Sequence, residues 1–104
     1  MPAAFIYQAS GIGVAEYDRV NGLLGIDSKN NSGNWPPGLL SHAAGTADDG
    51  SFVVMEVWES REAQGRWMQE QLGPALQQGG VTVTPKITWV DLVSYNQPQD
   101  AAAG

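Results

Sequence analysis

The chain has 104 residues, which fits a single domain, and its 11 acidic and 5 basic side chains give a net charge of −6. This acidic balance argues against nucleic acid as a partner, because such partners attract clustered Lys and Arg. The chain has no cysteine and one histidine, which excludes disulfides, thiolate nucleophiles and the usual zinc ligand sets. We therefore expect no metal site and no cofactor.

The N-terminal stretch MPAAFIYQAS has no basic region, and no apolar run approaches the ~18 residues that a membrane span needs. Neither a signal peptide nor a membrane partner is predicted. We expect a cytoplasmic protein.

The first half of the chain predicts a strand, a helix and a loop. Residues Ala3–Ala9 are rich in β-branched and aromatic side chains and end at a turn-forming Ser-Gly segment, which is typical of a strand. A helix ending near Gly25 is then predicted by apolar residues at near-helical spacing, namely Val14, Tyr17, Val20 and Leu24. Residues Ile26–Pro37 are rich in Asn, Ser, Gly and Pro, which predicts a long surface loop.

The second half predicts a hairpin, a helix and a strand. Gly38–Gly45 and Ser51–Trp58 are strand-like runs joined by a segment ending in Asp-Gly, which indicates antiparallel pairing. A second helix begins at the N-cap Ser60. Pro74 should break or kink it at the preceding glycine, because a proline ring clashes with the carbonyl four residues earlier.

The last predicted strand is Lys86–Tyr95, and residues 97–104 form a tail that we expect to be flexible because it has nothing to bury. The order strand, helix, strand, strand, helix, strand predicts a ferredoxin-like α+β fold in a single domain, residues 1–96. Its four-stranded antiparallel sheet should carry both helices on one face.

The strand before the second helix has two apolar faces, because side chains alternate along a strand. We expect the purely apolar set, Val53, Met55 and Val57, to face the helices. The other set contains Phe52, Val54, Glu56 and Trp58, and is too apolar to remain in water. A second copy of the chain is the simplest cover, so we predict a homodimer that buries this face.

His42 is the first candidate for proton transfer, because histidine is the residue type best suited to that step near neutral pH. A two-residue turn in the hairpin would place it opposite Val57, toward the helices, whereas a slip of one residue would bring it to the side of Glu56. The alternative is a structural histidine. Glu56 is either a general base or half of a salt bridge.

Aromatic residues give less specific signals. Trp35, beside two prolines, could cover a pocket or fix its loop. The helical spacing of Trp67 on the second helix predicts a core residue rather than a cofactor contact.

The chain resembles the dimeric α+β barrel superfamily, especially its antibiotic-biosynthesis-monooxygenase-like branch. The resemblance covers residues 3 to 95 and is carried by PPGLLSHAAG, by VVMEVWESREA and by LGPAL. It implies a homodimer with one pocket per subunit between helices and sheet. Some members oxidise polycyclic or quinol-like substrates there with molecular oxygen and no cofactor.

Trp58 matches a tryptophan of this branch. Members that oxidise polyketides carry an Asn four residues before it and a Tyr six residues after it, where this chain has Val54 and Gln64. Haem-degrading members place a haem-ligating His where this chain has Met68, so haem degradation is not expected.

The resulting hypothesis is a homodimeric, cofactor-free monooxygenase that acts on an aromatic or other hydrophobic metabolite. His42 would transfer a proton, and the substrate would contact Trp58, Tyr17, Trp67 and Glu56. The alternatives are a non-catalytic ligand-binding or stress-related barrel, and an isomerase or cyclase on the same scaffold.

Overall fold

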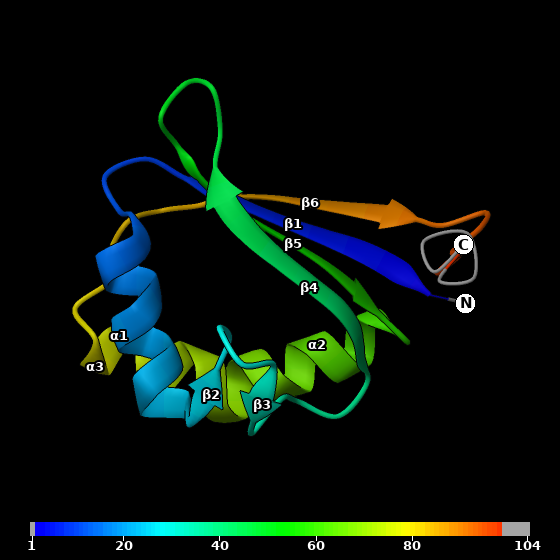
Figure 1. The fold of residues 1–104 in the computed structure, drawn as a ribbon, viewed down its shortest axis with the longest axis horizontal. Coiled ribbons are helices and arrows are strands. Elements are labelled where there is room, and N and C mark those ends of the chain that lie inside the picture. The colour runs from blue at the N-terminus through cyan, green and yellow to red at the C-terminus, as the bar shows by residue number, and fades with distance from the viewer. Residues whose placement is uncertain (1, 99–104) are drawn as a thin grey trace.

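The computed structural model describes residues 2–98 and contains one four-stranded antiparallel sheet with the helices on one face (Figure 1). The strand order is β4-β5-β1-β6. This is the predicted ferredoxin-like α+β fold. The elements are β1 (Ala3–Ala9), α1 (Val14–Leu24), β2 (Ile26–Asp27), β3 (Ser32–Gly33), β4 (Leu39–Thr46), β5 (Phe52–Trp58), α2 (Arg61–Trp67), η1 (Met68–Leu72), α3 (Gly73–Gln78) and β6 (Lys86–Asp91).

Helix α1 begins and ends at glycines. At its start the Glu16 side chain accepts a 2.6 Å hydrogen bond from the backbone N–H of Gly13. At its end Gly25 takes a left-handed conformation (φ 75°), which suits a residue without Cβ. Val20 and Leu24 are its buried residues, so α1 turns one narrow face toward the sheet and the other helices.

The segment predicted as a loop, 26–37, contains the short strand pair β2–β3. Ile26 pairs with Gly33 and buries its side chain in the core. The backbone N–H of Asn34 also bonds to the carbonyl of Gly25 at 2.9 Å. Two pairs of residues are too few to give an alternating pattern, which is why the sequence indicated a loop. The hairpin lies beside β4 in Figure 1.

The predicted assignment of the faces of β5 is wrong. Phe52, Glu56 and Trp58 are buried on the helix side, whereas Met55 is 49% exposed on the opposite side. The charged residue lies in the core because it is paired there, and this pairing removes the main cost of burying a carboxylate. The outer face of the sheet is nevertheless apolar, with Ile6 beside Met55 and Val57 across from Ala4.

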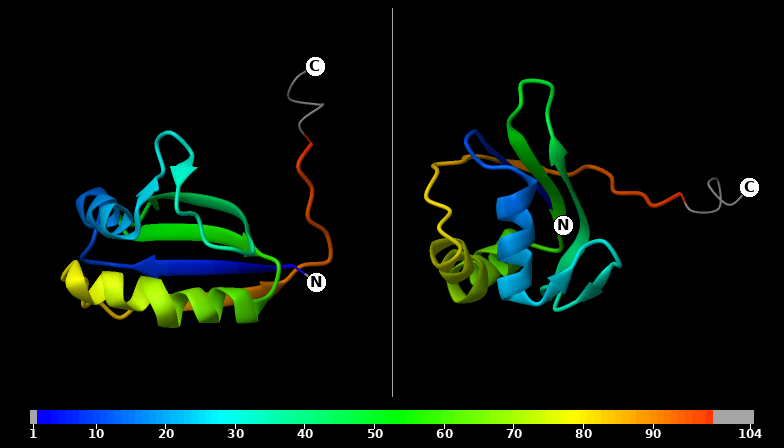
Figure 2. Two further views of the ribbon diagram at one scale, coloured as in Figure 1. Left: turned by 90° about the horizontal axis from the view of Figure 1, so that it is seen from below. Right: turned by 60° about the vertical axis from the view of Figure 1, so that its left-hand side comes forward.

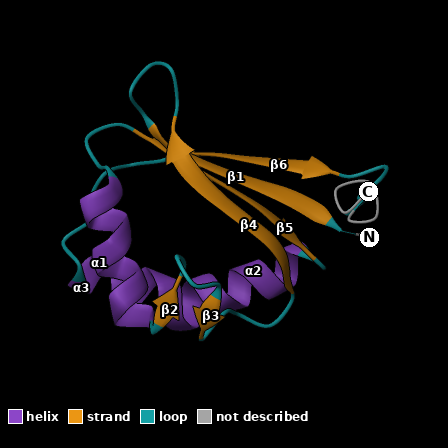
Figure 3. Cartoon of the chain, in the orientation of Figure 1, coloured by secondary structure: helices purple, strands orange, loops and turns teal. Residues whose placement is uncertain are grey.

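The second helix is not broken at Pro74. It runs through α2, η1 and α3 without interruption, as Figure 3 shows. The middle section is a π-helix, in which the N–H of Gly73 bonds to the carbonyl of Met68, five residues earlier. This wider turn accommodates the missing N–H and the ring of Pro74, and it places Leu72 against the interior.

Strand β6 ends at Asp91, four residues before the predicted end. Asp91 pairs with Ala3, the first residue of β1, so the strand has no further partner in β1 beyond this point. Residues 92–98 then leave the sheet and extend away from the body (Figure 2). Of the predicted tail, residues 99–104 lie outside the described part of the chain.

The core lies between the sheet and the helices. Trp58 is fully buried and packs on Trp67 with the ring centroids 5.7 Å apart. The other buried members of this cluster are Phe5, Val20, Leu24, Ile26 and Ala75. In the described residues, the helices are too short or too polar to cross a membrane.

Candidate functional site

The register of the β4–β5 hairpin places His42 directly opposite Glu56. The turn is closed by hydrogen bonds from Ala47 N–H to the carbonyl of Ser51 and from Gly50 N–H to the carbonyl of Ala47. The loop is thus longer than the two-residue turn, and the pairing with Val57 that such a turn would impose is wrong. The slipped register is the observed one, and it directs both side chains toward the helices.

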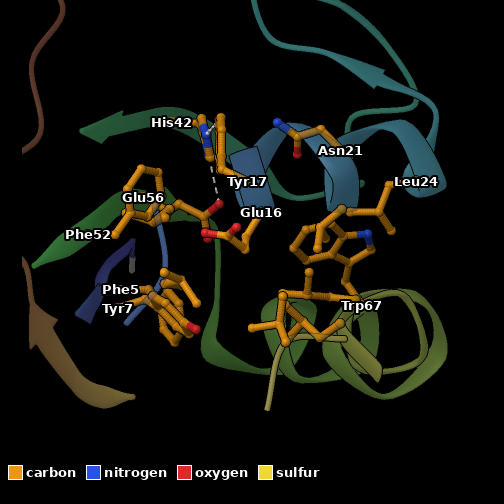
Figure 4. Close-up of a pocket in the computed structure, with 16 residues that line it drawn as sticks. Phe5, Tyr7, Glu16, Tyr17, Asn21, Leu24, His42, Phe52, Glu56 and Trp67 are labelled. Atoms are coloured by element: carbon orange, nitrogen blue, oxygen red, sulfur yellow. Dashed lines mark hydrogen bonds and ion pairs between the residues drawn. The ribbon is translucent and has the colours of Figure 1, made fainter. Parts of the chain in front are cut away.

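Four side chains from three elements form a continuous hydrogen-bonded chain, and Figure 4 shows three of them, Tyr17, His42 and Glu56. Tyr17 on α1 places its hydroxyl 2.5 Å from Nε2 of His42 on β4. His42 Nδ1 lies 2.8 Å from Oε2 of Glu56, and the indole N–H of Trp58 donates to Oε1 of the same carboxylate at 3.0 Å. We call these four residues the relay.

The relay fixes the roles of the two imidazole nitrogens. An ionised carboxylate only accepts hydrogen bonds, so Nδ1 of His42 carries the hydrogen that it donates to Glu56. Nε2 is then free to accept the hydroxyl hydrogen of Tyr17. The relay is largely shielded from water, since the side chain of His42 is 15% exposed and that of Glu56 is 5% exposed. This arrangement of carboxylate, imidazole and hydroxyl can move a proton.

Aromatic rings surround the imidazole. The ring of Tyr17 stacks nearly parallel to that of His42, with centroids 5.9 Å apart and an interplanar angle of 13°. Trp35, which follows the β2–β3 hairpin, approaches the imidazole from another direction at 5.1 Å. The loop tryptophan thus contacts the candidate base directly.

Two spaces meet at His42 and Tyr17. The first, which we call the interior cavity, lies between sheet and helices and measures about 80 Å³; its wall includes Phe5, Tyr7, Val54, Glu56, Trp67 and Leu72. The second, which we call the outer groove, lies between β4 and the β2–β3 hairpin and measures about 660 Å³. His42 and Tyr17 line both spaces, so the relay reaches each of them.

Four of the five predicted site residues line the interior cavity, and the fifth lies outside its wall. His42, Glu56, Tyr17 and Trp67 all line the interior cavity, as Figure 4 shows. Trp58 is not in that lining and is fully buried behind Glu56. The patterns gave no sign that Tyr17 bonds to His42, because 25 residues separate them.

Burial also acts on Tyr7, another residue of the cavity wall, and raises the pKa of its phenol above the ordinary value. Among residues 2–98, no group of three His, Asp or Glu side chains is arranged to hold a metal ion.

No family model matches the sequence, and no curated protein matches it. Solved structures match its fold over nearly the whole chain. One is SnoaB from Streptomyces nogalater, described as a cofactor-independent oxygenase, with a TM-score of 0.61 at 16% identity, covering 93% of this chain and 97% of SnoaB. The chain has the fold of antibiotic-biosynthesis-monooxygenase-like proteins.

Two further solved structures match the fold of this chain. Rv0793 from Mycobacterium tuberculosis has a TM-score of 0.64 at 16% identity and covers 93% of this chain and all of its own. A candidate antibiotic biosynthesis monooxygenase from Caulobacter crescentus has a TM-score of 0.61 at 19% identity and covers 89% and 91% of the two chains. At these identities the likeness concerns the fold.

Proposed function

We propose that this antibiotic-biosynthesis-monooxygenase-like protein oxidises an aromatic small metabolite with dioxygen and without a cofactor. The observation that carries the proposal is the relay, which joins a carboxylate, an imidazole and a phenol at the meeting point of two spaces. The description of SnoaB as a cofactor-independent oxygenase on the same fold supports the choice of reaction.

The relay supplies the proton transfer that such a reaction requires. Tyr17 accepts a proton from the substrate while passing its own hydroxyl proton to Nε2 of His42, and Glu56 stabilises the imidazolium that forms. The deprotonated, electron-rich ring then supplies electrons to dioxygen. For an oxidisable CH₂ group, one oxygen atom becomes the new carbonyl and the other leaves as water with the two hydrogens of that carbon.

We further propose that the protein works as a homodimer joined through the outer face of the sheet. Met55 and Val90 are 49% and 41% exposed there, although both are large apolar residues. They stand beside half-buried Ile6, Val53 and Val57 on the same face. A second copy would remove this apolar surface from water at ~25 cal/mol per Å².

The test is oxygen consumption with a panel of quinols and polycyclic phenols, comparing wild type with His42→Ala and with the strand control Thr46→Ala. Circular dichroism should confirm that both variants fold. The proposal expects uptake by wild type and by Thr46→Ala, and a loss of about 10²-fold or more in His42→Ala.

Three outcomes would contradict the proposal. Unchanged turnover in His42→Ala would remove the relay from the mechanism. Conversion of substrate without oxygen uptake would instead indicate an isomerase or cyclase. Binding without conversion would indicate a ligand-binding protein.

A further inference from the structure

Three buried side-chain nitrogens among residues 2–98 have no hydrogen-bond partner in the protein, namely those of Asn21, Trp35 and Gln64. A buried donor without a partner destabilises the folded state, and each such group calls for an explanation, of which a catalytic role is one. Of these three residues, Asn21 belongs to the wall of the interior cavity. Its amide is therefore a donor that the fold leaves available in the space between the helices and the sheet.

Asn21 stands one helical turn from the reactive end of the relay. It follows Tyr17 by four residues on α1, and side chains at this spacing are neighbours on one helix face, with Cβ atoms ~5–6 Å apart. In Figure 4 the nitrogen of Asn21 points toward the side of the cavity where Tyr17 and His42 lie. One ligand oxygen between the two side chains can therefore contact both the Tyr17 hydroxyl and the Asn21 amide.

The two side chains offer complementary hydrogen bonds to such an oxygen. The hydroxyl of Tyr17 gives its hydrogen to Nε2 of His42, so its oxygen is left to accept one from a ligand, whereas the amide nitrogen of Asn21 can only donate. A ligand hydroxyl satisfies both at once. The cavity of about 80 Å³ holds a few groups of the size of water, at ~30 Å³ each, so the hydroxyl fits. A ring attached to it requires the apolar side chains of the wall to move apart.

Loss of the ligand proton creates a charge that needs a donor. The oxygen that gives its proton to Tyr17 becomes negative, and in the described part of the chain the cavity wall contains no Lys or Arg. It contains instead the carboxyl groups of Glu16 and Glu56, and carboxylates disfavour a further negative charge nearby. A neutral donor that is fixed in place and directed at the oxygen stabilises such a charge, as in an oxyanion hole.

We propose that Asn21 is a catalytic residue of this site, whose amide N–H donates to the substrate oxygen that loses its proton to Tyr17. The inference rests on the proposed function, because the relay supplies the proton transfer. The proton passes from the substrate oxygen to Tyr17 while the Tyr17 hydrogen passes to Nε2 of His42. The negative charge left on the substrate oxygen is held by Asn21.

The unpartnered donor is tested first by stability. Asn21→Leu keeps a side chain of similar size and removes its polar atoms. The midpoint of urea unfolding should rise, because the folded state no longer buries an unsatisfied N–H. A midpoint that does not rise would show that the amide is satisfied in the folded protein and would overturn the proposal.

Oxygen uptake then separates function from stability. With the substrates that wild type oxidises, Asn21→Leu should lose about 10²-fold or more in kcat, which is the usual effect of removing an oxyanion donor. Gln64→Leu is the matched control. It also removes an unpartnered buried nitrogen, but from a residue outside the walls of both spaces, and it should keep its kcat. Equal kcat values for wild type and Asn21→Leu, or equal losses in the two variants, would overturn the proposal.

The ionisation of bound 4-nitrophenol gives a readout without turnover, because the yellow colour of this compound reports its anion. An amide that donates to the oxygen favours the anion, so Asn21→Leu should raise the pKa of the bound probe by about one unit or more, a tenfold change in the ionisation constant. Equal pKa values in the two proteins would contradict the role of Asn21. A shift in Tyr7→Phe alone would also contradict it, since the oxygen would then lie against β1. No binding at millimolar concentration would overturn the site.

The two proposals fail separately. Ionisation of the bound probe that depends on Asn21, together with no oxygen uptake from any substrate, would reject the oxygenase and retain Asn21 as the donor. Oxygen uptake by wild type that is unchanged in Asn21→Leu would reject the role of Asn21 and retain the oxygenase.

Discussion

The indole N–H of Trp58 donates a 3.0 Å hydrogen bond to Oε1 of Glu56, two residues earlier on β5. Alternation along the strand places both side chains on the helix face, and Trp58 is fully buried there. One carboxylate oxygen is thereby occupied, which leaves Oε2 to hold His42. Within the relay, Trp58 is thus the positioning residue, because it acts on His42 only through Glu56.

We predict that Trp58→Phe lowers the free energy of unfolding by about 1.5–3 kcal/mol, because a buried hydrogen bond to a charged group is lost. Urea denaturation measures the change. Trp67→Phe is the matched control, since Trp67 packs on Trp58, whereas the indole hydrogen bond to the carboxylate comes from Trp58. Equal losses in the two variants would show that ring volume, and not the hydrogen bond, accounts for the effect.

A second prediction concerns Glu56→Gln, which keeps the shape of the side chain and removes its charge. The amide cannot stabilise an imidazolium as a carboxylate does, so turnover should fall by about 10²-fold. The ring ¹⁵N shifts of His42 provide a readout that stability alone would not change. Wild type should show hydrogen on Nδ1, and the variant should show a mixture of the two neutral forms. Unaltered shifts and turnover together would exclude Glu56 from the relay.

The hairpin predicts a pH effect on stability. Asp49 accepts hydrogen bonds from the backbone N–H and the hydroxyl of Ser51, which hold its pKa below the ordinary value of 3.8. A lowered folded-state pKa means that the stabilisation is present above pH ~4 and is lost as the pH falls through the folded-state value. Asp49→Asn should therefore be less stable than wild type at neutral pH and approach it in acid, in thermal melts from pH 7 to 2. A gap that stays constant with pH would contradict this assignment.

The sequence predicted the order of the main elements because each long element carries its own periodic pattern. The apolar spacing of α1 and the alternation of β5 are local signals. The hairpin between β4 and β5 followed from turn residues such as Gly50, which is left-handed in the structure (φ 87°).

The faces of β5 could not be predicted in the same way, because the cost of burying Glu56 depends on its partners. His42 lies 14 residues away in sequence, and its position depends on the register. One residue of slip decides whether the two side chains meet. The contact between His42 and Tyr17 is even harder to predict from the sequence, because it depends on how α1 packs against the edge of the sheet.

The last prediction tests the outer face of the sheet. Met55 is 49% exposed and pairs with Ile6 and Ala43 on the neighbouring strands. If two such faces pack together, a charge at this position would be buried without a partner and would separate the subunits. Sedimentation at micromolar concentration should therefore give a dimer for wild type and an 11.1 kDa monomer for Met55→Glu.

Leu23→Glu is the matched control for this experiment, because Leu23 is 44% exposed on α1, away from the sheet face. It should remain a dimer. A wild type that sediments as a single chain would reject the proposed interface. So would a Met55→Glu variant that stays dimeric, since the charge would then lie outside the contact.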